Sequence, residues 1–251
     1  MWKLFPFRRT QIADGDWRRA LAHCAYARAL PKVDRDRLRD LANTFLATKS
    51  FDGAAGFEPT PHVRTVIALK ACVPILNLGL NYYRGWSDIV VYPSDFRVHD
   101  EYVDPAGVVH RDTRELCGQS LSQGPMVLSW DAIAADRGAA DRDVVIHECA
   151  HKLDILNGAP NGFPPLHEHM SARRWSRTFN DAYEQFADAV DADKPTELDP
   201  YAATDPAEFF AVATETYFSE PTIVEREFPR VYTELADFFR QDPLIVLRAQ
   251  T

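Results

Sequence analysis

Hydrophobic positions along the chain follow two different spacings, which separate helical from strand-forming segments. Apolar residues recur every three or four positions over 16–48, which predicts two amphipathic helices with Pro31 near the break between them. The stretch from Val63 to Leu78 is mostly apolar and predicts a buried helix interrupted near Pro74. The same helical spacing returns in the second half of the chain, over 142–157, 171–190, 205–219 and 229–241.

Short runs rich in β-forming residues lie between these helical segments. Residues 88–92 and 124–130 are bounded by turn residues and predict strands. The sequence Asp104-Pro-Ala-Gly107 predicts the turn of a hairpin that joins 101–103 to 108–110. Helices around such strands indicate an α+β fold with a small mixed or antiparallel sheet flanked by helices.

Glycine and proline mark the loops, and no shift in composition divides the chain. Loops are predicted over 52–56 and 158–165, where these residues cluster. Residues 1–251 are therefore expected to form a single domain with a helical N-terminal portion.

Composition narrows the class of protein. The chain has 251 residues, of which 46% are hydrophobic and 26% charged, as in ordinary globular proteins. No apolar run approaches the roughly 20 residues of a membrane helix, and the first nine residues lack the features of a secretory signal. We therefore expect a cytoplasmic protein with no membrane partner. The net charge of −9 argues against a direct nucleic-acid partner, which requires clustered positive charge.

The predicted helix 142–157 contains a motif that can bind a metal ion. It reads His147-Glu148-Cys-Ala-His151. Each helical residue advances by about 100°, so the two histidines lie about 40° apart and one turn along the helix, where both imidazoles can reach one metal ion. Glu148 lies beside them, suited to act on a metal-bound water without binding the metal. The opposite side carries an apolar stripe for the core, formed by Val145, Ile146, Cys149, Leu153 and Leu156.

A catalytic zinc site usually has three protein ligands, so the motif lacks one. A histidine six residues after the second one would indicate a metzincin, but that position is Asn157. Asp154 lies one turn beyond the second histidine. It is a candidate third ligand, or a carboxylate that orients an imidazole by accepting its N–H. Glu208 and Glu215 are seven residues apart in the predicted helix 205–219 and share nearly the same face. Spacing alone leaves all three acidic residues open.

Several blocks of the sequence resemble a known family. The motif His147-Glu-Cys-Ala-His-Lys-Leu-Asp154, followed by Gly162-Phe-Pro-Pro-Leu166 and Tyr201-Ala-Ala-Thr-Asp-Pro-Ala-Glu208, is similar to the Mlc titration factor A family of bacterial zinc peptidases. Residues 127–130 and 240–243 are also similar, so the likeness covers most of the chain. The block from Tyr201 to Glu208 also resembles the catalytic domain of anthrax lethal factor, a related zinc peptidase. In both, a tyrosine precedes the third ligand by seven residues.

The resemblance implies a zincin-like metallopeptidase domain with the metal motif on a central helix. It implies a gluzincin-type site in which His147, His151 and Glu208 hold one Zn²⁺ per chain. Glu148 would be the general base, and Tyr201 would donate to the reacting carbonyl oxygen. Glu215 would then lie behind the ligands or on the helix surface.

The implied function is hydrolysis of a peptide substrate, as an endopeptidase or an aminopeptidase, together with binding of the transcriptional repressor Mlc that regulates glucose uptake. A second hypothesis is a regulatory protein that sequesters a repressor with hydrolysis secondary or absent. A third is a structural zinc site, which Glu148 disfavours because such a site needs no proton-transferring carboxylate. The strand 124–130 either pairs with an extended peptide at a sheet edge or belongs to the core.

Overall fold

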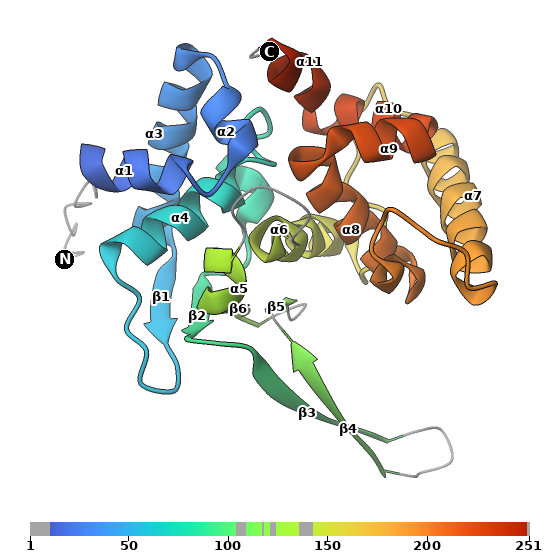
Figure 1. The fold of residues 1–251 in the computed structure, drawn as a ribbon, viewed down its shortest axis with the longest axis horizontal. Helices are drawn as coiled ribbons and strands as arrows, with labels where there is room; N and C mark the ends of the chain where they lie inside the picture. The colour runs from blue at the N-terminus through green and yellow to red at the C-terminus, as the bar shows by residue number, and fades with distance from the viewer. Residues whose placement is uncertain (1–10, 104–108, 117, 121–123, 136–142, 250–251) are drawn as a thin grey trace, which may run out of the picture.

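The computed structural model describes residues 11–103, 109–116, 118–120, 124–135 and 143–249 (Figure 1). Helices make up most of this part of the chain, and a small sheet lies among them, so the fold is α+β, as predicted. In Figure 1 the N-terminal helices lie on the left, the C-terminal helices on the right and α6 between them.

The N-terminal portion is helical, with one more helix than the sequence predicts. The sequence predicts two helices over 16–48, whereas the structure has three: α1 (Asp14–Leu21), α2 (Ala25–Ala29) and α3 (Lys32–Thr48). Pro31 is the N-cap of α3, but neither proline nor glycine marks the break between α1 and α2. The predicted buried helix is α4 (Pro61–Cys72), which ends just before Pro74.

The main sheet has four strands in the order β1-β2-β6-β5. Strands β1 (Ser50–Gly53), β2 (Asp88–Tyr92) and β6 (Met126–Ser129) are parallel, whereas β5 (Gly118–Ser120) runs antiparallel to β6. The sheet is therefore mixed, one of the two predicted forms.

One detail of the predicted sheet is wrong, and one of two open alternatives is decided. Strand β1 occupies part of the predicted loop 52–56, and β6 is an interior strand with β2 on one side and β5 on the other. The segment 124–130 therefore has no free edge for a peptide, because β2 and β5 already take its backbone hydrogen bonds.

The predicted hairpin is present and longer than expected. Strands β3 (Phe96–Val103) and β4 (Val109–Leu116) pair in antiparallel register, and the predicted turn 104–107 lies outside the described residues. Figure 1 shows this ribbon extending away from the helices.

The second half of the chain is helical, as predicted. The predicted helices appear as α6 (Val144–Asp154), α7 (Ala172–Asp191), α8 (Pro206–Ser219) and α10 (Pro229–Phe239). Three short helices were not predicted: α5 (Trp130–Ala135), α9 (Pro221–Glu227) and α11 (Pro243–Arg248). The predicted loop 158–165 is irregular, after the 3₁₀ turn η2 (Ile155–Asn157). Two further 3₁₀ turns are η1 (Leu80–Tyr83) and η3 (Pro200–Ala203).

The metal-motif helix α6 is enclosed by the core. It packs against α4 on one side and α8 on the other. All residues from Val144 to Ala150 are buried, so the apolar stripe expected for this helix is confirmed where it falls on them.

In the part of the chain that the structure describes, no helix is both long and apolar enough to cross a bilayer.

A buried ion pair fixes the beginning of α6. Asp143 is the N-cap of this helix and accepts a hydrogen bond from the backbone N–H of Ile146. Its other carboxylate oxygen lies 3.1 Å from Nζ of Lys70 on α4, and both side chains are buried. The pair therefore joins the metal-motif helix to the N-terminal portion.

Replacing Lys70 by methionine is expected to lower the free energy of unfolding by about 3–5 kcal/mol, because it leaves the carboxylate of Asp143 buried without its cation. Urea unfolding followed by circular dichroism measures this loss. The control is Lys32→Met, which removes the cation of an exposed pair with Asp36 and should change stability by less than about 1 kcal/mol. Equal losses of unfolding free energy in the two variants would contradict the assignment of Lys70 and Asp143 as a stabilising buried ion pair.

Candidate metal centre

His147 and His151 bring their Nε2 atoms together on one side of α6. The two nitrogens are 3.2 Å apart and the ring centroids 4.9 Å apart. His147 is buried and His151 half-buried. The one-turn spacing therefore places both imidazoles as the sequence predicts.

Glu208 completes the cluster from the first turn of α8. Its Oε2 atom lies 3.1 Å from Nε2 of His147 and 3.4 Å from Nε2 of His151. Asp205 positions this turn, since its side chain accepts the backbone N–H groups of Ala207 and Glu208 as the N-cap of α8. Within the described residues these three side chains form a group that could hold a metal ion.

The two other acidic candidates point elsewhere. The Oε2 atom of Glu215 lies 3.4 Å from Nδ1 of His147, the ring nitrogen on the opposite side from the cluster. A carboxylate in this place orients the imidazole and increases its basicity. Asp154 faces the loop that follows α6 and accepts backbone N–H groups there. Of the three candidates, Glu208 alone reaches the two facing nitrogens.

The charges in the cluster suit a cation. Burial by itself would raise the pKa of Glu208, but the imidazoles of His147 and His151 outweigh it and hold this pKa well below its usual value. The carboxylate is therefore ionised, as a metal ligand must be. Its buried Oε2 atom lies 3.1 and 3.4 Å from the two ring nitrogens but has no hydrogen-bond partner among the described residues. A metal ion in contact with all three atoms would satisfy this buried oxygen.

Glu148 and Tyr201 lie beside the cluster. Glu148 is buried, and its Oε2 atom has no hydrogen-bond partner among the described residues. Burial raises the pKa of Glu148, although the imidazoles of His147 and His151 oppose the shift. The hydroxyl of Tyr201, from η3, donates to Oε1 of Glu208 at 3.1 Å. The structure thus brings together the five residues to which the resemblance assigns a ligand or catalytic role, which are His147, Glu148, His151, Tyr201 and Glu208.

Comparison with known proteins identifies the family of this chain. Residues 2–240 match the family described as glucose-regulated metallo-peptidase M90. The chain is 37% identical over 234 residues to Mlc titration factor A of Escherichia fergusonii, covering 92% of this chain and 88% of the relative. It is 36% identical over 251 residues to Mlc titration factor A of Yersinia enterocolitica, covering 99% and 92%. The chain therefore belongs to this metallopeptidase family, which confirms the resemblance seen in the sequence.

Proposed function

We propose that this protein is a zinc-dependent peptidase of the zincin-like, gluzincin type. The observation that carries the proposal is the triangle of ligand atoms, with edges of 3.1, 3.2 and 3.4 Å. Zn–N and Zn–O bonds of about 2.0–2.1 Å in tetrahedral geometry place neighbouring ligand atoms about 3.3–3.4 Å apart. His147, His151 and Glu208 would therefore hold one zinc ion, and a catalytic zinc site with three protein ligands keeps one position for water or substrate.

The remaining residues supply the proton transfers and the stabilisation of charge. Zinc held there would polarise the substrate carbonyl and lower the pKa of a bound water molecule from about 15.7 towards 7. Glu148 accepts a proton from the attacking water and passes it to the leaving amine. Its burial suits this role, since a raised pKa lies nearer to neutral pH. Tyr201 donates its hydroxyl proton in a hydrogen bond to the carbonyl oxygen that becomes negative, in exchange for its bond to Glu208.

The substrate is proposed to bind along β5 instead of β6. Strand β5 is at the end of the strand order and lies against α6, the helix that carries the two histidines. Within the described chain, only its side facing β6 is paired. An extended peptide added to the other side would run beside the metal helix, with main-chain hydrogen bonds supplying affinity.

The Tyr201→Phe variant is expected to reduce turnover by about 10²–10³-fold with zinc content unchanged, because it removes a donor to the developing negative charge. Steady-state kinetics and metal analysis of the same preparation measure both effects. Tyr183→Phe is the matched control, since its hydroxyl donates to the carbonyl of Ala203 in the same 3₁₀ turn without reaching the cluster. Turnover by Tyr201→Phe within threefold of the control would remove Tyr201 from the reaction.

Peptide hydrolysis tests the proposed function. A defined peptide mixture is incubated with zinc-loaded protein and with chelator-treated protein, and the products are identified by mass spectrometry. We expect cleavage only with the zinc-loaded protein. Loss of single N-terminal residues would indicate an aminopeptidase, and internal cuts an endopeptidase. Protein that binds zinc but cleaves no peptide would contradict the enzymatic proposal.

The name of the relatives supports a second role. They are called Mlc titration factor A, which links the family to Mlc. We propose that this chain also binds an Mlc repressor, with hydrolysis secondary in that role. Titration of labelled Mlc with the Glu148→Gln variant tests binding without cleavage, and no saturable binding would exclude this role.

Cytoplasmic location and a single domain over residues 1–251 stay predictions.

A further inference from the structure

We propose that Asp154 and Gly162 are positioning residues that set the distance between the two helices that hold the metal ligands. This inference rests on the proposed metal site. The two histidines lie on α6 and Glu208 on α8, 57 residues beyond His151 in the sequence. Because the ligand triangle has edges of 3.1–3.4 Å, a shift of α8 by a few tenths of an ångström changes every distance to Glu208.

Asp154 fastens the loop 158–165 to the end of α6. Its side chain is fully buried, less than one turn beyond His151. One oxygen accepts the backbone N–H groups of Asn161 and Gly162 at 2.7 and 2.8 Å, and the other accepts that of Phe163 at 2.8 Å. An ionised carboxylate that accepts three backbone donors makes strong hydrogen bonds. Three consecutive residues of the loop are thereby fixed to the metal-motif helix.

Gly162 packs directly against α8, so the position of the loop determines the position of that helix. A Cβ atom at Gly162 would lie 2.6 Å from the carbonyl oxygen of Pro206 and 3.5 Å from Cβ of Phe210. Pro206 and Phe210 flank Glu208 in the first turns of α8, so the loop backbone lies directly on the part of the helix that presents the third ligand. A φ of +75° also favours glycine here.

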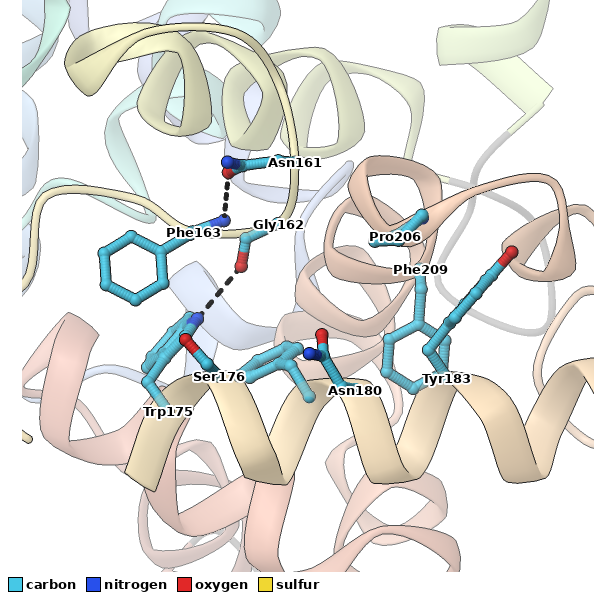
Figure 2. A pocket seen from close by; sticks show the side chains of 10 residues that line it. Asn161, Gly162, Phe163, Trp175, Ser176, Asn180, Tyr183, Pro206 and Phe209 are labelled. Atoms are coloured by element: carbon cyan, nitrogen blue, oxygen red, sulfur yellow. Dashed lines mark hydrogen bonds between the residues drawn. The ribbon is translucent and has the colours of Figure 1, made fainter. Parts of the chain in front are cut away.

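The opposite side of the loop is held by α7. Figure 2 shows the indole nitrogen of Trp175 donating to the carbonyl oxygen of Gly162, a bond of 2.9 Å, with Pro206 on the other side of the same residue. Trp175 is fully buried. The loop therefore has little freedom to move away if a side chain were added at position 162, and α8 would have to shift instead.

The affinity of the folded apoprotein for Zn²⁺ tests the inference. It is measured by competition with a chromogenic chelator, with circular dichroism to show that each variant is folded. The test variant is Gly162→Ala and the matched control is Gly158→Ala. Both glycines lie in the same loop at positive φ, but a Cβ at Gly158 meets no atom within 4 Å. Both variants thus carry the backbone strain of an alanine at positive φ, whereas only Gly162→Ala adds a close contact with α8.

We expect zinc to bind at least about tenfold more weakly to Gly162→Ala than to Gly158→Ala, as when a residue that supports a ligand is replaced. Equal affinities in the two variants would overturn the inference. If Gly162→Ala does not fold, Asp154→Asn answers the same question, because the amide offers a single acceptor oxygen to three N–H groups. Wild-type zinc affinity in that variant would also overturn it. Wild-type protein that binds no zinc would instead refute the proposed function.

Discussion

Replacement of Glu148 by glutamine is expected to lower peptide hydrolysis by about 10²–10⁴-fold while the protein keeps its zinc. The amide has nearly the shape of the carboxylate but cannot accept the proton of the attacking water. Glu148 is buried and its Oε2 atom has no hydrogen-bond partner among the described residues, so the substitution breaks no described hydrogen bond of that atom. The fold is therefore expected to tolerate it.

Single-turnover kinetics and metal analysis on the same samples measure this effect. The control is the zinc content, which should equal that of the wild type because Glu148 is not a proposed ligand. Activity above about one tenth of wild type would show that another group transfers the proton.

The second large effect is expected from Glu208, in comparison with Glu215 on the same helix. Glu208→Gln removes the anionic ligand of the proposed site and should weaken zinc binding by more than about 100-fold. Glu215→Gln alters the group that faces Nδ1 of His147, and substitutions of this kind weaken metal binding by about 10–100-fold. We expect this variant near the lower end, since the amide still offers an acceptor oxygen.

Zinc competition titrations of both variants compare the same chemical change at two positions of α8. The order of the two affinities is the decisive result. If Glu215→Gln lost more affinity than Glu208→Gln, Glu215 would be the ligand.

The sequence predicts the metal helix well because its signal is local. One helical turn between His147 and His151 suffices to bring the Nε2 atoms to 3.2 Å. The third ligand could not be chosen in this way. Glu208 and Glu215 share a face of α8, but they are about 10 Å apart along its axis at 1.5 Å per residue. That distance places Glu208 at Nε2 and Glu215 at Nδ1 of His147. Only the packing of α8 against α6 decides which of the two carboxylates reaches Nε2, the nitrogen that faces His151.

Features that depend on distant contacts were missed. The sequence predicts the Asp154 carboxylate as a metal ligand or as a partner of an imidazole, yet it accepts backbone N–H groups of a loop seven to nine residues later. The sequence does not predict strand β1, and the predicted loop 52–56 covers its last two residues, because four residues ending in Gly53 have little periodicity of their own. Its pairing with β2, 38 positions further along the chain, defines it as a strand.

The most direct test of the metal centre is crystal diffraction from zinc-loaded protein, with data collected at the zinc absorption edge. We predict one strong anomalous peak per chain, in contact with Nε2 of His147, Nε2 of His151 and a carboxylate oxygen of Glu208. No peak between these three side chains, or a peak bound to Glu215 or Asp154 in place of Glu208, would contradict the proposed site.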